Sequence, residues 1–283
     1  NSYLAHSFTI MKILVFLWMG INFLTNIDPK RIPELDKYQI LNSPSNLSLI
    51  LALNLKEKPF DDIEVRKAIN LAIDKNKVIQ LAMNGKGTPI YTNMSPVMSK
   101  FLWNAPEEQA NLEKAKQILE EKKLLPMKFT LKVPNSSKIY LDTAQSIKEQ
   151  LKDIGITVNL EMIEWATWLS DVYTNKKYVA SLAGLSGKME PDAILRRYTS
   201  TYAKNFTNFN NARYDALIEE AKRTSNEAKQ VENYKEAQKI LAEEQAAIFL
   251  MDPNTIIATE KGLEGFEFYP LPYLNFAKLY FKK

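Results

Sequence analysis

One stretch of the chain, residues 183–192, combines residue types that suit the binding of a small ligand. Gly187 has no side chain, so a ligand could approach the backbone there. The neighbouring Lys188 carries a positive charge, which attracts a carboxylate and repels an ammonium group. Pro191 is a typical first residue of a helix, whose free N–H groups could meet an anion. The alternative is that Lys188 is simply solvated, since lysine is rarely buried.

Aromatic residues provide a second group of candidates. Trp165 and Trp168 lie three residues apart, so they share one face of a helix predicted near residues 165–173. Trp165 is the candidate for a ligand contact, and packing in the core is the alternative for both rings. Residues 198–209 hold four further aromatics among Ser, Thr and Asn, which could line a pocket or cover the domain.

The composition excludes several kinds of chemistry. The chain has no cysteine and one histidine, His6, so a two-histidine metal site is excluded and a Ser-His-Asp triad would need His6. Carboxylates are plentiful, but no compact carboxylate pair or Ser-Lys motif appears. The 37 basic and 33 acidic residues nearly balance, which argues against a nucleic-acid partner. We therefore expect a protein that is not an enzyme and needs no cofactor or metal.

Strands and helices alternate along the chain, which predicts an α/β domain with helices packed on a mixed sheet. Asp61 and Asp62 are candidate caps for a helix that starts near Ile63, and Asp74 for a helix that stops at Asn84. Other helices are expected at about 110–122, before Gly155, near 165–173 and from 214 to about 246. The strands are expected at 47–53, 128–133, 156–162, 178–183, 248–251, 255–258 and 278–281.

The start of the chain allows three interpretations. Residues 10–24 are almost wholly apolar and resemble the hydrophobic region of a signal peptide, although no small-residue cleavage site follows. The stretch is short for a membrane span and could instead be a buried strand. The third possibility is that the first residues reflect truncation or a shifted reading frame.

Several ordered motifs resemble those of family-5 extracellular solute-binding proteins, the peptide- and nickel-type binding proteins of ABC importers. The longest runs from Leu53-Asn54 through Pro59-Phe60-Asp61-Asp62 and Val65-Arg66-Lys67-Ala68 to Ala72-Ile73-Asp74. Shorter matches follow in the same order: Gly85-x-Gly87-x-Pro89, Ala115-Lys116, Ile154-Gly155-Ile156, Tyr214-Asp215, and Tyr234 with Ala237-Gln238. Arg66 is expected to make structural hydrogen bonds in that motif, with a ligand contact as the alternative.

The resemblance implies an α/β fold, namely a periplasmic-binding-protein-like (type II) lobe with a mixed sheet. It covers the C-terminal half of the family pattern only, so it implies a fragment of a two-lobed protein. We expect residues 1–19 to be of uncertain assignment and 20–46 to be a connector belonging to lobe one. Residues 47–258 would form the second lobe, and 259–283 would return as strands to lobe one.

The stretch described first resembles the family's cleft-facing loop, in which an acidic residue neutralises a peptide's amino group. This chain departs from that pattern, since Leu185 stands where Trp is usual and Lys188 where the acid, or in other relatives Arg, is found. A ligand held by its amine at residue 188 is therefore not expected. The candidate ligand-binding residues are Trp165, Gly184, Leu185, Ser186, Gly187 and Lys188.

The resemblance implies a binding protein that captures a small peptide or similar polar solute between two lobes and delivers it to an ABC permease in the membrane. It would act in the periplasm or at the extracellular face of the cytoplasmic membrane, with or without a lipid anchor. Peptides, nickel chelates, opines and glutathione all remain open as the solute. The alternative is a ligand-sensing domain of a cytoplasmic transcription regulator built on the same lobe.

Overall fold

The computed structural model describes residues 22–269, 271 and 273–282. It divides into two compact units. Of the described residues, 44–254 and 271 form the central unit, and 22–43, 255–269 and 273–282 form the terminal unit. His6 and most of the apolar stretch 10–24 lie outside the described residues, so the three interpretations of that stretch stay open.

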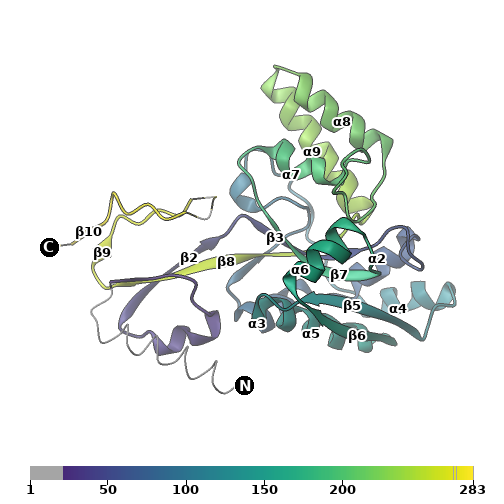
Figure 1. The fold of residues 1–283 in the computed structure, drawn as a ribbon, viewed down its shortest axis with the longest axis horizontal. Coiled ribbons are helices and arrows are strands. Elements are labelled where there is room, and N and C mark those ends of the chain that lie inside the picture. Colours follow the sequence, from purple (N-terminus) through teal and green to yellow (C-terminus); the bar gives the residue numbers. More distant parts are fainter. Residues whose placement is uncertain (1–21, 270, 272, 283) are drawn as a thin grey trace. The chain divides into compact units, whose positions relative to one another are not determined.

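The central unit is built on a mixed sheet (Figure 1). Strand β3 (Leu47–Leu53) pairs antiparallel with β7 (Ala180–Ser186) on one side and with β8 (Ile248–Glu260) on the other. Strand β5 (Met127–Pro134) lies between β7 and β6 (Ile156–Ile163) and runs parallel to both. A short strand, β4 (Gly87–Pro89), pairs antiparallel with β8. The predicted α/β class with a mixed sheet is confirmed.

Strand β3 shows why this sheet is covered on both faces. Leu49, Leu51 and Leu53 belong to one buried cluster, whereas Ile50 and Ala52, which alternate with them, belong to another. Successive side chains of a strand point to opposite faces, so an uninterrupted apolar run needs an apolar partner on each side.

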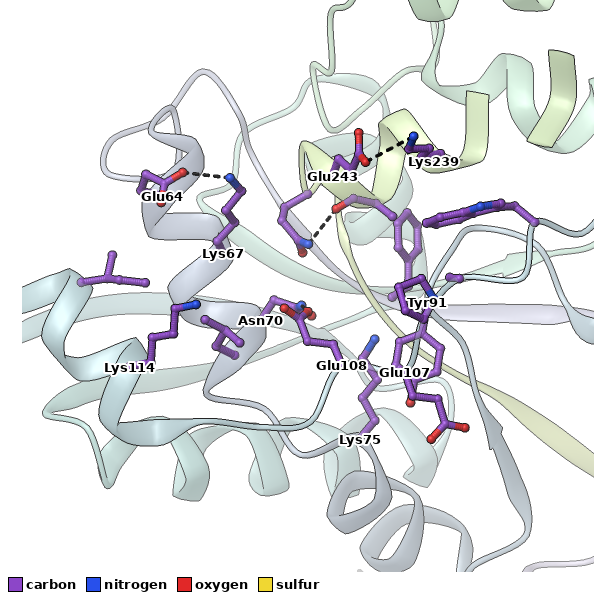
Figure 2. A pocket seen from close by; sticks show the side chains of 18 residues that line it. Glu64, Lys67, Asn70, Lys75, Tyr91, Glu107, Glu108, Lys114, Lys239 and Glu243 are labelled. Carbon is purple, nitrogen blue, oxygen red and sulfur yellow. Dashed lines mark hydrogen bonds and ion pairs between the residues drawn. The ribbon is translucent and has the colours of Figure 1, made fainter. Parts of the chain in front are cut away.

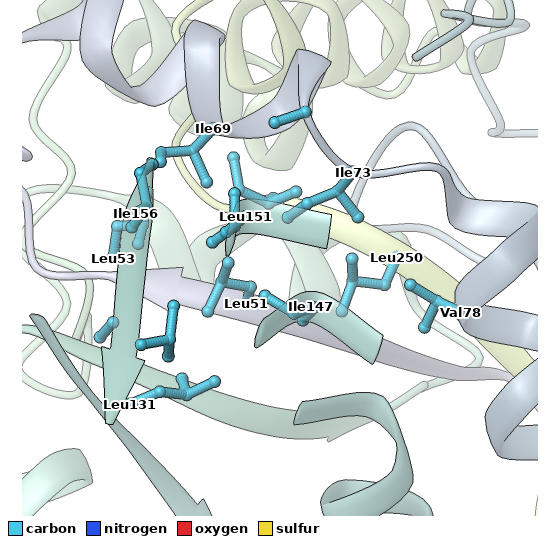
Figure 3. Packing of buried hydrophobic residues seen from close by; sticks show 14 of the residues in the cluster. Leu51, Leu53, Ile69, Ile73, Val78, Leu131, Ile147, Leu151, Ile156 and Leu250 are labelled. Carbon is cyan, nitrogen blue, oxygen red and sulfur yellow. The ribbon is translucent and has the colours of Figure 1, made fainter. Parts of the chain in front are cut away.

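Four helices cover the first face of the sheet: α2 (Ile63–Leu71), α3 (Lys75–Met83), α4 (Leu112–Glu121) and α5 (Lys138–Lys152). Figure 3 shows Ile69, Val78 and Ile147 from these helices packed with strand residues such as Leu51 and Leu131. The second face is covered by shorter elements and two longer helices: α6 (Trp165–Thr167), the π-helical turn η3 (Trp168–Thr174), α7 (Pro191–Leu195), the 3-10 turns η2 (Pro96–Met98) and η4 (Arg196–Tyr198), α8 (Ala212–Arg223) and α9 (Glu227–Glu243).

Local capping fixes the ends of the first helices as the sequence predicts. The Asp62 carboxylate accepts a hydrogen bond from Glu64 N (2.9 Å), and Asp74 accepts one from Asn76 N (2.9 Å). Helix α3 ends at Asn84, whose φ of +47° is the left-handed conformation that stops helices. Asp61 does not cap α2, because Asp62 occupies the N-cap position.

Arg66 has the structural role predicted for it. It is buried, and its guanidinium donates to the carbonyl oxygens of Phe60 (3.0 Å) and Asp61 (3.2 Å). The same group donates to Glu244 O (2.7 Å) and Gln245 O (3.1 Å). Arg66 therefore joins the turn before α2 to the end of α9, which leaves its donors engaged within the domain.

One predicted division of the chain is wrong. Two strands were expected at 248–251 and 255–258, separated by Pro253 and Asn254, but β8 is a single strand of 13 residues. The fixed φ of proline is compatible with an extended chain, so Pro253 removes a hydrogen-bond donor without ending the strand. Pro253 lies opposite Gly87 of β4.

The terminal unit contains short elements. Strand β1 (Phe23–Leu24) pairs antiparallel with Thr259 and Ala258 of β8, and β2 (Tyr38–Pro44) also pairs with β8. A 3-10 helix, η1 (Pro29–Glu34), precedes β2, and β9 (Leu263–Glu264) pairs with β10 (Tyr280–Phe281). In the described part of the chain, no helix has both the length and the apolar character needed to cross a membrane.

The limits of the central unit, 44 and 254, lie close to the predicted lobe limits of 47 and 258. The assignment of 20–46 and 259–283 to a first lobe, and of 47–258 to a second, stays a prediction.

Candidate ligand-binding site

The two sequence segments singled out as ligand contacts come at the ends of two parallel strands of the sheet. Trp165 begins α6 after β6, and residues 187–190 follow β7, with β5 lying between these strands. Because β5, β6 and β7 are parallel, both segments leave the sheet at its carboxyl edge. Ligands of α/β proteins commonly bind at this edge. We call the six candidate residues at this edge the sheet-edge site.

Half of the sheet-edge site lies in a strand and not in a loop. Strand β7 continues to Ser186, so Gly184, Leu185 and Ser186 pair with β3, opposite Leu49, Ser48 and Leu47. The predicted strand at 178–183 ended too early because glycine is a poor strand residue by propensity, whereas the β3 ladder holds the backbone extended.

Neighbouring protein groups explain why residues 184 and 187 have no side chain. A Cβ at Gly184 would lie 2.5 Å from the Tyr140 hydroxyl oxygen, and one at Gly187 would lie 2.0 Å from Asn46 Oδ1. Gly187 N also donates to Asn46 O (2.5 Å). Both glycines therefore make room for neighbouring protein groups, and the space beside Gly187 is occupied by Asn46.

Lys188 is exposed at the end of β7, next to Met189, which is 48% exposed, and Glu190. Among the described residues, Lys188 has no salt-bridge partner. Helix α7 follows directly but is only five residues long. The ammonium group is therefore available to an anionic ligand at low desolvation cost.

Arg197 is a second cation near this edge that sequence reasoning missed. Its Nη2 donates to Ser186 O (2.7 Å). Burial lowers the pKa of Arg197, but a guanidinium stays charged at neutral pH. The only sequence signal was the Arg196-Arg197 pair after α7, which does not indicate which side chain turns back to the strand.

The two tryptophans differ in burial: one is a core residue and the other is exposed. Trp168 is 3% exposed and its Nε1 donates to Ser181 Oγ (3.0 Å) on β7, so it is a core residue. Trp165 is 41% exposed and stacks on Trp168, with ring centroids 4.9 Å apart and an interplanar angle of 4°. Met162 and Leu169, three residues before it and four after it in the sequence, are also exposed. Trp165 thus offers an open ring face held in place by a buried one.

The other aromatic segment mainly covers the domain. Tyr198, Phe206 and Phe209 are buried in the second cluster, and Tyr198 lies against Phe249. No group of three or more potential metal ligands occurs within the part of the chain that the structure describes.

Comparison with known proteins gives a consistent result. The family model described as bacterial extracellular solute-binding proteins, family 5 Middle, matches residues 20–206. The oligopeptide-binding protein AppA of Bacillus subtilis (strain 168) is 29% identical over 275 residues, which cover 88% of this chain and 50% of the relative. Di/tripeptide-binding protein 1 of Pseudomonas aeruginosa (strain UCBPP-PA14) is 31% identical over 235 residues, covering 77% and 43%.

Solved structures share the fold. The structure of AppA from Bacillus subtilis in complex with a nonapeptide aligns with a TM-score of 0.80 and 26% identity, over 95% of this chain and 57% of that one. A putative peptide-binding protein AppA from Clostridium difficile aligns with a TM-score of 0.88 and 19% identity, over 97% and 59%. The chain spans about half the length of the curated relatives named above. It belongs to the bacterial extracellular solute-binding proteins of family 5.

Proposed function

We propose that this chain supplies one lobe of a solute-binding protein that captures a small peptide, or a similar polar solute, and delivers it to an ABC permease. The proposal is supported by the family membership and by relatives described as oligopeptide-binding and di/tripeptide-binding. The solute would be held between this lobe and a second one. The site of action would be the periplasm or the extracellular face of the cytoplasmic membrane.

The observation that carries the choice of solute is the chemistry of the sheet-edge site. Lys188 is an exposed cation, and Trp165 is an exposed, stacked ring at the same edge of the sheet. A cation favours the carboxyl end of a peptide over its amino end. An open aromatic face accepts an apolar or aromatic side chain. A short peptide that presents its C-terminal carboxylate to Lys188 satisfies both groups.

The transcription-regulator alternative has no support among the relatives described above, each of which is named as a binding protein. Solute binding is therefore the function that the relatives and the sheet-edge site support best.

The experiment titrates the full-length protein with short peptides that carry either a free C-terminal carboxylate or a C-terminal amide. We expect the free peptides to bind at least ~10-fold more tightly, because only they pair with the ammonium of Lys188. Lys188→Ala should remove this difference. Lys177→Ala, an exposed lysine before the start of β7, is the matched control and should keep it.

Two results would count against the proposal. Equal affinity for acid and amide peptides in the wild-type protein would remove Lys188 from the site. A failure of every peptide to bind would contradict peptides as the solute class and leave the other polar solutes to be tested in the same way.

A further inference from the structure

A pocket with a volume of about 880 Å³ lies elsewhere in the central unit. It is open to solvent on one side and is lined by α2, the start of α3, α4, the end of α9 and the segment between Tyr91 and Glu108 (Figure 2). It shares no lining residue with the sheet-edge site. We call it the helix pocket. Its volume is within the range of pockets that hold small molecules in proteins.

Lys75 is the unusual residue of the helix pocket. It is 8% exposed, and its Nζ donates to Ile90 O (3.0 Å) and lies 4.1 Å from the centroid of the Tyr91 ring. Among the described residues, no carboxylate forms a salt bridge with it. An ammonium group has three N–H donors, so the protein leaves part of this one's capacity unused.

The helix pocket carries charges of both signs around Lys75. Lys114 extends from α4 into the pocket and has no salt-bridge partner among the described residues (Figure 2). Glu108 accepts a hydrogen bond from Asn70 Nδ2, and its charge acts on Lys75. Lys67 is already paired with a glutamate, with Nζ 2.9 Å from Glu64 Oε1.

Aromatic side chains form the remaining wall. Tyr91, Trp103 and Phe249 line the pocket, and the backbone N–H of Trp103 donates to Gln238 Oε1 (3.2 Å). The pocket therefore offers cations, a carboxylate and an apolar surface side by side. Polar groups that converge on an apolar cavity are typical of small-molecule sites.

We propose that the helix pocket is a second binding site, for a free α-amino acid with a large apolar or aromatic side chain. The ligand's carboxylate would take hydrogen bonds from Lys75, and its ammonium would face Glu108. Lys114, on the other side of Glu108, would add positive charge to the pocket (Figure 2). Its side chain would lie against Trp103 and Tyr91. The inference does not depend on the function of the sheet-edge site, since it rests on other residues.

An anionic ligand group near Lys75 would also stabilise the charged form of this lysine, which burial disfavours in the free protein. Burial lowers the pKa of Lys75 to about 7, and Glu108 opposes this only in part. A carboxylate placed beside the ammonium would favour its charged form. A desolvated ion pair that also satisfies free donors is stronger than one in solvent.

The test measures binding of L-phenylalanine to the full chain by calorimetry or ligand-observed NMR. The comparison compounds are N-acetylphenylalanine, which lacks the ammonium, and phenylalaninamide, which lacks the carboxylate. We expect saturable binding of phenylalanine and at least ~10-fold weaker binding of each blocked compound, because each loses one charge-assisted contact. Lys75→Met should weaken phenylalanine binding by ~10-fold or more. Lys114→Met should weaken it by a smaller factor, because Lys114 acts on the ligand from the other side of Glu108.

The controls separate this site from the other one. Lys116→Met changes an exposed lysine of α4 that does not line the helix pocket, and Lys188→Ala changes the sheet-edge site. Both should leave phenylalanine affinity unchanged. Lys114 is exposed, so its variant should fold normally and gives a second, independent test. The proposal is overturned if phenylalanine does not bind saturably, if both pocket variants bind it normally, or if Lys188→Ala abolishes its binding.

Discussion

Lys188 and Lys75 place the same side chain in two opposite environments. Lys188 is exposed at the carboxyl edge of the sheet, whereas Lys75 is 8% exposed inside the helix pocket, with one carbonyl acceptor and an aromatic ring. An exposed ammonium keeps its hydration, so it costs the fold almost nothing. A buried one without a salt bridge opposes folding. We therefore expect substitution of Lys188 to leave stability unchanged and substitution of Lys75 to change it; a role of either lysine in ligand binding is a proposal.

Asp252 provides a third case for this comparison, because it is a buried carboxylate that accepts several hydrogen bonds. It is fully buried, and its carboxylate accepts from Ser45 N (2.9 Å), Ser45 Oγ (2.8 Å) and Asn46 N (3.0 Å). Leu47 N (3.3 Å) and Ser95 Oγ also donate to it. Burial raises the pKa of the Asp252 carboxyl, and the hydrogen bonds that it accepts oppose this rise. Its loss would leave those donors without an acceptor, so the network as a whole should stabilise the fold.

The largest expected effect is therefore that of Asp252→Ala. Removing the carboxylate leaves several buried donors unsatisfied, which should lower the free energy of unfolding by about 3–5 kcal/mol. Urea denaturation followed by circular dichroism measures the loss. Asp153→Ala, at an exposed carboxylate, should change it by less than about 0.5 kcal/mol. Similar values for the two variants would show that the Asp252 network contributes little.

The second-largest expected effect is a stabilisation, caused by Lys75→Met. Lys75→Met should raise the free energy of unfolding at pH 7, because the wild-type lysine has a pKa of about 7 when folded and 10.5 ordinarily. That difference corresponds to an upper limit of about 5 kcal/mol. The lost hydrogen bond to Ile90 O offsets about 1 kcal/mol of the gain.

The pH dependence of this gain is a second measurement. Between pH 7 and 10.5 the unfolded lysine binds a proton that the folded one has released, so raising the pH favours the folded wild type. The advantage of Lys75→Met should be largest below pH 7 and shrink towards pH 10. Lys77→Met, at an exposed lysine of α3, should show neither gain nor trend. A gain that does not vary with pH would mean that packing, and not charge burial, causes it.

Gly187→Ala should lower the stability by a smaller amount, because Gly187 lies between the exposed Lys188 and the buried Asn46. The new Cβ would meet the buried amide of Asn46, so the loop must shift, at a cost of about 1–3 kcal/mol. Ser186→Ala, in the same segment, should be nearly neutral because Ser186 is exposed. Thermal denaturation distinguishes the two, and an unchanged midpoint for Gly187→Ala would mean that Asn46 moves aside freely.

The smallest expected effect on stability is that of Lys188→Ala, less than about 0.5 kcal/mol. The contrast between this value and the loss of peptide affinity proposed above is the signature of a residue that acts only on a ligand. A destabilisation above 1 kcal/mol, measured by the same urea titration, would show that Lys188 has a structural partner and would break the comparison.

Much of the fold could be predicted from the sequence because it depends on nearby residues. Asp62 and Asp74 cap helices through atoms two positions away, and the apolar run of β3 requires a strand covered on both faces. The spacing of Trp165 and Trp168 predicts that they share a helix face, but it does not show which ring is exposed; packing against the sheet buries Trp168.

The tertiary structure decided what depends on residues far apart in the chain. Asp252 meets Ser45 across 207 positions, and residues of α2, α3, α4 and α9 line the pocket around Lys75. Pairing with neighbours made β8 one strand and extended β7 to Ser186, against the propensities of proline and glycine. A sequence pattern reports local preference, whereas ladder hydrogen bonds and burial are supplied by distant partners and outweigh it.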